Sequence, residues 1–223
     1  MTKPVAWSYS ALTAFETCPK RYYLTKIAKT VQEPQSEAMK WGNEVHKALE
    51  HRLVQGTALP KTMEMFEPIA VKVADAAKGG KLQAEQKMAI NVRYVPTTWF
   101  AKDVWARGIT DFQITKGTKM FIGDWKTGKP DEGSGQLKMT AAMAMHHNPN
   151  VKTVINTFVW LKTGGTTTEV FTREDIPTIW QEFAPRVQRL EHAVADNKFP
   201  ARPSGLCRAW CPVGKANCEH CGT

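Results

Sequence analysis

The architecture of this chain follows from two segments, Gly108-Ile109-Thr110-Asp111 and Gly123-Asp124-Trp125-Lys126-Thr127-Gly128. Each carboxylate ends an apolar, strand-like run, which starts at Val104 in the first case and at Met120 in the second. Side chains two residues apart on a strand point to the same face. Asp124 and Lys126 therefore project together, with Trp125 on the opposite side. If the two strands pair as a hairpin, Asp111 comes alongside them.

Two carboxylates beside a lysine are suited to one divalent metal and one phosphate. Mg²⁺ and Mn²⁺ take hard oxygen ligands, which Asp111 and Asp124 supply. The ammonium of Lys126 can orient an attacking water or stabilise the negative charge that develops on a phosphate. An Asp-x-Lys triplet also occurs on ordinary exposed hairpins, so its interpretation depends on the rest of the chain.

Hydrophobic periodicity predicts helices and strands on both sides of these segments. The predicted helices are two within residues 8–55, the second from Ser36 to Leu53, and three more at Met63–Ala77, Gly135–His147 and Asp175–Asn197. The predicted strands are Leu82–Val92, Val104–Ile114, Met120–Trp125, Val151–Leu161 and Thr167–Thr172. No internal repeat or long linker interrupts the series, which indicates one domain with a cysteine-rich C-terminal tail.

The composition agrees with a globular protein that binds a polyanion. The 223 residues are 42% hydrophobic and 23% charged, enough for one sizeable core and too apolar for a disordered chain. Lys and Arg outnumber Asp and Glu by 30 to 21, which gives a formal net charge of +9. A basic surface suits a nucleic acid, although many proteins are basic without a specific partner.

The start of the chain carries no signal-peptide pattern, because Met1-Thr2-Lys3-Pro4 leads directly into polar sequence. No apolar run approaches the roughly 18 residues that a membrane helix needs. We therefore expect a cytoplasmic protein with no membrane partner. Its cysteines are expected to be reduced, so disulfides are not predicted.

Further motifs stand on both sides of the two opening segments. The N-terminal part contains Ser8-Tyr9-Ser10-Ala11-Leu12, Cys18-Pro19-Lys20-Arg21-Tyr22 and Gly42-Asn43-Glu44-Val45-His46-Lys47-Ala48-Leu49-Glu50. A helix that begins at Gln136-Leu137 follows the Asp-x-Lys segment. In this order the motifs resemble the PD-(D/E)XK nuclease superfamily, and specifically its RecB-type branch with the CRISPR-associated iron–sulfur exonucleases and many phage exonucleases. One departure is Thr140, where the family often has tyrosine.

The resemblance implies an α/β fold with a central mixed β-sheet flanked by helices, which is a restriction-endonuclease-like core. It implies a nuclease domain over residues 1–200, with N-terminal helices in residues 8–55 and a catalytic core in residues 81–172. Residues 201–223 are then a cysteine-rich metal-binding tail that packs on the same domain.

The resemblance also implies the residues of the site. The metal ligands would be His46, Asp111, Asp124 and the backbone carbonyl of Trp125, with Mg²⁺ or Mn²⁺ as the ion. The catalytic residues would be Asp111, Asp124, Lys126 and Gln136. Glu85 is a further acidic candidate for the metal, with an exposed charge as the alternative. Candidates for contact with DNA are Lys20, Arg21 and Lys138.

The five cysteines form a second candidate metal site. Cys18 belongs to the N-terminal motif, and Cys207, Cys211, Cys218 and Cys221 lie close together in the tail. Cysteine-rich tails in a reduced compartment usually bind metal. The resemblance to iron–sulfur members implies a [4Fe–4S] cluster on Cys18, Cys207, Cys211 and Cys218, although each gap is one residue wider than in the expected pattern. The alternative is a structural Zn²⁺ on the four tail cysteines.

The resemblance predicts a Mg²⁺- or Mn²⁺-dependent DNA exonuclease that acts on single strands or free ends in resection, recombination or degradation. A phage origin and a single-strand annealing partner would suit such an enzyme. Two alternatives stay open: a non-catalytic DNA-binding accessory module of the same fold, and a structure-specific endonuclease. Trp99 and Phe100 could stack on unpaired bases or fill the surface of the sheet.

Overall fold

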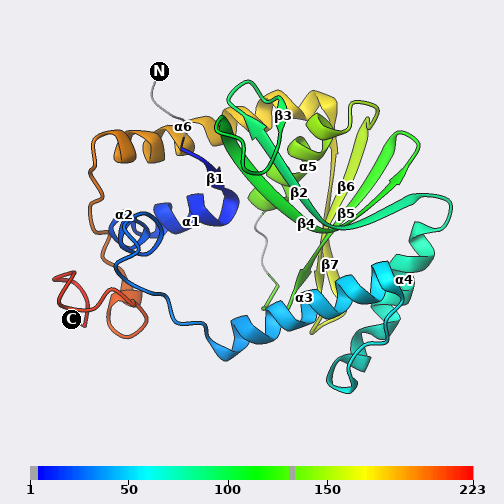
Figure 1. Ribbon diagram of the computed structural model, residues 1–223, viewed down its shortest axis with the longest axis horizontal. Coiled ribbons are helices and arrows are strands. Elements are labelled where there is room, and N and C mark those ends of the chain that lie inside the picture. The colour runs from blue at the N-terminus through cyan, green and yellow to red at the C-terminus, as the bar shows by residue number, and fades with distance from the viewer. Residues whose placement is uncertain (1–4, 131–133, 223) are drawn as a thin grey trace.

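A mixed sheet of seven strands forms the centre of the computed structural model, which describes residues 5–130 and 134–222 (Figure 1). The strands are β1 (Trp7–Ser8), β2 (Lys81–Asn91), β3 (Pro96–Thr97), β4 (Val104–Lys116), β5 (Lys119–Lys126), β6 (Thr153–Trp160) and β7 (Gly165–Thr172). Their order is β3-β2-β4-β5-β6-β7, with β1 added to β4. The β1–β4 and β5–β6 pairs are parallel and the others are antiparallel. The predicted mixed sheet is therefore confirmed.

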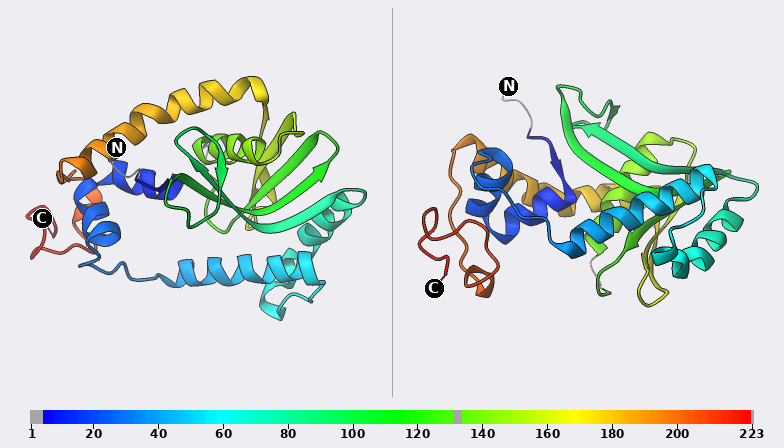
Figure 2. Two further views of the ribbon diagram at one scale, coloured as in Figure 1. Left: turned by 45° about the horizontal axis from the view of Figure 1, so that its top comes forward. Right: turned by 60° about the horizontal axis from the view of Figure 1, so that its bottom comes forward.

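Helices cover both faces of this sheet (Figures 1 and 2). The α-helices are α1 (Tyr9–Thr17), α2 (Pro19–Tyr22), α3 (Glu37–Gln55), α4 (Glu67–Ala77), α5 (Ser134–His147) and α6 (Ile176–Ala195). The short helices are η1 (Tyr23–Ile27), η2 (Lys61–Phe66), η3 (Arg173–Asp175) and η4 (Gly205–Cys207). No helix in the described part of the chain is long and apolar enough to cross a bilayer.

Alternation along the strands supplies two separate hydrophobic cores. On β5, Met120 and Ile122 pack in a core that also contains side chains of α1, α5 and α6. Trp125 points to the opposite face, where it joins Val45 and Leu49 of α3 and side chains of α4. Because residues two apart share a face, the strand can bury apolar groups on both sides and still present Asp124 and Lys126 at its end.

Prolines explain where the helices differ from the prediction. The chain over residues 8–55 forms α1, α2, the π-helical η1 and α3 rather than two helices. Cys18, between α1 and α2, has an extended backbone with φ −160° and ψ 106°. A proline disfavours the helical conformation in the residue before it, and Pro19 follows Cys18. The predicted helix Met63–Ala77 likewise starts as the 3₁₀-helix η2, and α4 begins beside Pro68.

Candidate active site

The candidate site lies at a gap along one edge of β4. The strand β2 occupies the other edge of β4 over most of its length. On the first edge, β1 pairs with Ala106 and Arg107, and β5 pairs only from Phe112 onward. The segment from Gly108 to Asp111 lies between these two neighbours. It has no strand partner on this edge of the described sheet, so side chains from other elements can approach it.

Asp111 links β4, β5 and α3. Its Oδ2 accepts a hydrogen bond from the backbone N–H of Trp125 at 2.6 Å, which ties β4 to the end of β5. Its Oδ1 lies 3.0 Å from Nδ1 of His46 on α3. Asp111 is buried, and the side chain of Trp125 lies in the core on the opposite face. The carboxylate therefore holds the end of the hairpin in place.

Asp124, Lys126 and Gln136 form a closed triangle beside Asp111. Nζ of Lys126 lies 2.6 Å from Oδ2 of Asp124 and donates to Oε1 of Gln136 at 3.0 Å. Nε2 of Gln136 donates to Oδ1 of Asp124 at 2.6 Å. The ammonium also lies over the ring of Phe158, 4.4 Å from its centroid. These contacts fix the position of the ammonium, and charge-assisted hydrogen bonds are the strong ones.

Glu85 completes the acidic side of the site. It lies directly opposite Asp111 in the β2–β4 ladder, and its backbone φ of +49° is in the left-handed region. Among the described residues, a single set of three metal-donor side chains has ligand atoms within 4.8 Å of one another: His46, Glu85 and Asp111. Asp124, engaged by Lys126 and Gln136, lies outside this set. A non-glycine residue in this backbone region is strained, and such strain is concentrated at functional sites.

Burial and mutual repulsion raise the pKa of two of the acids in the site. Burial raises the pKa of Asp124, and the charge of Asp111 raises it further, against the opposing effect of Lys126. Burial also raises the pKa of Glu85, together with the charges of Asp111 and Glu50. Burial and mutual repulsion therefore both disfavour the ionised forms of these carboxylates. A divalent cation would remove this repulsion, so the donor set fits a hard metal ion.

The negative charges of the site also act on His46. Burial alone would lower the pKa of His46, but the hydrogen bond and charge of Asp111, with the charges of Asp124 and Glu85, raise it. The helix α3 can bring His46 here because Gly42 lies one turn earlier. A Cβ at Gly42 would come within 3.3 Å of Oγ1 of Thr127, so the helix approaches the segment after β5 closely.

The residues predicted to touch DNA are each paired with an acid. Nζ of Lys20 lies 3.3 Å from Glu219, a guanidinium nitrogen of Arg21 lies 2.9 Å from Glu33, and Nζ of Lys138 lies 2.7 Å from Glu182.

Thr140, the departure from the family pattern, is buried. Its hydroxyl donates to the carbonyl of Gln136 at 2.9 Å, so it supports the glutamine helix from within.

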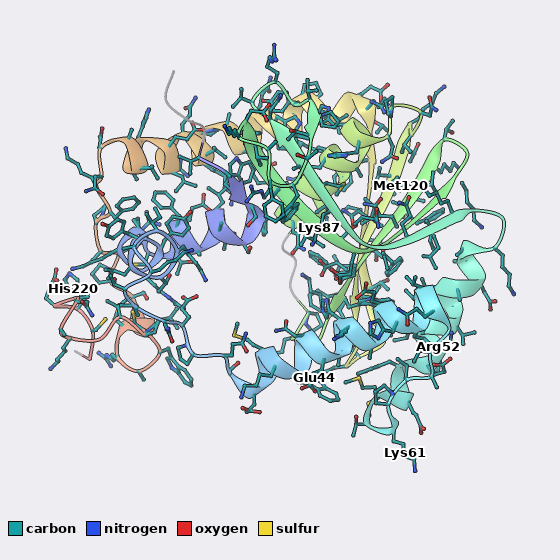
Figure 3. The ribbon with its side chains drawn as sticks, viewed as in Figure 1. Glu44, Arg52, Lys61, Lys87, Met120 and His220 are labelled. Atoms are coloured by element: carbon teal, nitrogen blue, oxygen red, sulfur yellow. The ribbon has the colours of Figure 1, made fainter. Side chains whose placement is uncertain are left out.

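The five cysteines gather where the tail meets α1 and α2. All five, with His220, line one small hollow, and His220 is labelled in the tail in Figure 3. Sγ of Cys18 accepts the N–H of Arg202 at 3.5 Å, and Sγ of Cys207 accepts the N–H of Ser204 at 3.4 Å. Burial and the thiols of Cys211 and Cys218 raise the pKa of Cys221 to about 12.

Two features of the site were not evident from the sequence. The strained conformation of Glu85 has no local signal, because its cause lies in the pairing of β2 with β4. The second is a cavity beside Gln136, where Arg107 lies together with Trp99, the residue that the sequence already indicated as a stacking candidate. Only the non-local pairing of β1 with β4 brings the N-terminal segment to that cavity.

The chain is similar to known proteins in sequence pattern and in fold. A family model described as the PD-(D/E)XK nuclease superfamily matches residues 6–219. A crystal structure of a candidate exonuclease from Eubacterium rectale is similar in fold, with a TM-score of 0.53 and 13% identity over 91% of this chain and 86% of that one. The crystal structure of SSO0001 is 14% identical over 99% and 89% of the two chains, at a TM-score of 0.42. No curated protein matches the chain.

Proposed function

The chain belongs to the PD-(D/E)XK nuclease superfamily, and from this premise we propose that it is a metal-dependent exonuclease that hydrolyses DNA. The observation that carries the proposal is the convergence of two groups around Asp111 on β4 and Asp124 on β5. One group is His46, Glu85 and Asp111, which suits a metal ion. The other is the triangle of Asp124, Lys126 and Gln136. An accessory module would need no such arrangement.

We assign the roles of the chain's own residues as follows. His46, Glu85 and Asp111 would hold Mg²⁺ or Mn²⁺, with Asp124 and the Trp125 carbonyl as further ligands. When bound, such an ion polarises the phosphoryl group and lowers the pKa of water. Lys126 orients the attacking water and stabilises the negative charge that builds up on the phosphate. The 3′ oxygen then leaves, and the product carries a 5′ phosphate.

Gln136 has a positioning role in this scheme. Its amide bridges Asp124 and Lys126, so it fixes the distance between the carboxylate and the ammonium. Its helix α5 is packed into the core by Leu137 and Met139, both 1% exposed. The packed helix therefore holds Gln136 in a fixed position relative to Asp124 and Lys126.

A nuclease assay tests the proposed function. Linear and circular single strands, and duplexes with labelled ends, are incubated with Mg²⁺, Mn²⁺ or EDTA. We expect metal-dependent loss of nucleotides from linear DNA and no cutting of circles. This activity on linear DNA should be absent in Asp124→Asn and retained in the control Asp75→Asn, whose side chain lies on α4. Cutting of circles would favour an endonuclease instead. Binding without cutting under any metal would favour the accessory module.

Glu85 provides a more specific prediction for the metal. Glu85→Gln should raise the metal concentration for half-maximal activity at least about tenfold, because a charged carboxylate ligand is replaced by a neutral amide oxygen. The same change should raise the melting temperature without metal, because like charges opposite each other on a ladder destabilise it. Titrations of activity with Mn²⁺ and thermal melts in EDTA measure the two effects. Glu64→Gln, in an exposed position on η2, is the control and should leave the metal requirement unchanged; an unchanged requirement in Glu85→Gln would exclude the ligand role.

We propose further that the cysteine site holds a [4Fe–4S] cluster on Cys18, Cys207, Cys211 and Cys218. Tetrahedral zinc would hold four sulfurs about 3.8 Å apart, from a Zn–S length of about 2.3 Å. Among the described cysteines, no three sulfurs lie within 4.8 Å of one another. What supports the cluster is Cys18, which lines the same hollow as the tail cysteines and would add a ligand from the N-terminal motif. Cys221, hydrogen-bonded to Cys211 and Cys218, would then lie beside the cluster without binding it. Its role would be to fasten the tail, residues 201–223, to the nuclease domain.

Two matched substitutions separate the cluster from zinc. For a cluster, Cys18→Ser should lose iron and the visible absorbance of the anaerobically purified protein, and Cys221→Ser should retain both. For zinc on the four tail cysteines, Cys221→Ser should lose zinc and Cys18→Ser should not. Metal analysis and absorption spectra decide between these patterns, and zinc without iron in the parent protein would refute the cluster.

A further inference from the structure

A cavity of about 460 Å³ opens beside Gln136, between β4 and the start of α1. Its wall includes Ser8, Tyr9, Ser10, Trp99 and Arg107. Gln136 belongs both to this wall and to the triangle with Asp124 and Lys126. The cavity therefore adjoins the place where the phosphate is proposed to react.

One side of the cavity is aromatic and cationic. The guanidinium of Arg107 lies 5.4 Å from the centroid of the Trp99 ring, and Nζ of Lys87 lies 5.9 Å from it. Lys87, labelled in Figure 3, reaches the ring from β2. Nε of Arg107 is buried and has no hydrogen-bond acceptor among the described residues. Buried donors are nearly always paired, so the cavity offers an unused N–H and a positive charge beside a flat ring, while Lys87 lies near the ring but outside the cavity wall.

We propose that this cavity takes the unpaired base of a nucleotide next to the bond that is cut. The base stacks on Trp99, and an oxygen of the base or its phosphate accepts a hydrogen bond from Arg107. Bases stack readily on aromatic rings and on guanidinium planes, whatever their sequence. The cavity is also within the size range of about 300–1,000 Å³ for small-ligand sites. The identity of the ligand rests on the proposed nuclease function.

A second hollow extends this route along α1. It measures about 520 Å³ and shares Ser8, Ser10 and Ala11 with the first cavity. Its wall also includes Arg21 and Lys26, together with Glu33, which forms an ion pair with each of them. Two cations against one carboxylate leave a net positive charge beside hydroxyl side chains. This suits the backbone of a single strand, which could run from the base cavity toward α2.

Abasic sites test this assignment. The parent protein degrades a labelled single strand that has one abasic site at a fixed internal position. The cleavage rate of each bond is compared with the rate for the same bond in the intact strand. We expect a pause at one register, about 5- to 150-fold slower than in the intact strand, when the abasic position enters the cavity. Trp99→Phe should keep the pause, and Trp99→Ala should lose it.

Binding in EDTA gives a readout that needs no cleavage. Trp99→Ala should weaken binding of the intact single strand about 5- to 150-fold. Phe100→Ala is the control, because Phe100 is 85% exposed in the same loop and outside the cavity wall. Equal losses in both variants, or a pause that persists in Trp99→Ala, would overturn the inference. If the parent protein binds in this Trp99-dependent manner but cuts no DNA, the nuclease proposal fails and the base cavity stands.

Discussion

Lys126→Met should lower kcat for DNA cleavage by a factor of about 100 to 1,000 or more, with little change in the amount of folded protein. The ammonium is 2.6 Å from Asp124, 3.0 Å from Gln136 and over the ring of Phe158, so its position is already fixed before substrate binds. Removing one preorganised electrostatic group from an active site typically costs about this factor. Methionine has a stem of similar length, and its thioether can contact the ring of Phe158 in place of the ammonium.

The control for this substitution is Lys119→Met, at the other end of the same strand and in an exposed position. Single-turnover cleavage of end-labelled DNA, with circular dichroism and thermal melting of each variant, separates chemistry from folding. Lys119→Met should cleave like the parent protein. Cleavage by Lys126→Met within a few-fold of the parent rate would show that another group carries the role assigned to Lys126.

The hairpin and its carboxylates could be predicted from the sequence because their signals are local. A period of two along Met120–Lys126 is sufficient to place Asp124 and Lys126 on one face and Trp125 on the other. The structure has this alternation, with Trp125 in the core beneath α3. The bounds of α3 were equally accessible, since Ser36 caps its start and Gly56 ends it with φ +71°.

The arrangement around the hairpin could not be predicted in the same way. Glu85 lies opposite Asp111 only because β2 pairs with β4 in one particular register. A single sequence carries no rule that specifies this register, and a shift by one residue would turn Glu85 to the other face. The parallel pairing of the two-residue strand β1 is non-local for the same reason. Pro19 and Pro68 did give a local signal for the helix breaks, through the restriction that proline imposes.

The acids of the site are held close together on three neighbouring strands. Glu85 lies on β2, Asp111 on β4 and Asp124 on β5, and burial and repulsion by Asp111 raise the pKa of Glu85 and of Asp124. A fold selected for stability alone would separate such groups. The energy for keeping them together comes from the two hydrophobic cores on either side of the sheet. This arrangement agrees with a site that is completed by a cation.

Gly123→Ala should destabilise the protein by about 1–3 kcal/mol, because the strand that carries Asp124 has no room for a Cβ at this position. An ideal Cβ on Gly123 would lie 2.0 Å from Cζ of Phe112, its partner in the β4–β5 ladder. The ring of Phe112 is buried against Trp125, with centroids 4.8 Å apart, so it cannot move aside freely. An aromatic ring that covers a glycine on the neighbouring strand is a recognised way of fixing register.

Gly128→Ala is the matched control, since a Cβ there would meet nothing within 4 Å. Thermal melts should show a lower melting temperature for Gly123→Ala, by about 2–4 °C for each kcal/mol, and none of this loss for Gly128→Ala. Phe112→Leu removes the clashing ring, so the double variant should be less destabilised than the sum of the two single changes. Phe112 adjoins Asp111 and Gly123 adjoins Asp124. Gly123→Ala should therefore also reduce the cleavage rate at temperatures below its melting temperature, where the protein is still folded. Additive losses, or a Gly123→Ala protein as stable as Gly128→Ala, would show that the ring does not lock the two catalytic strands together.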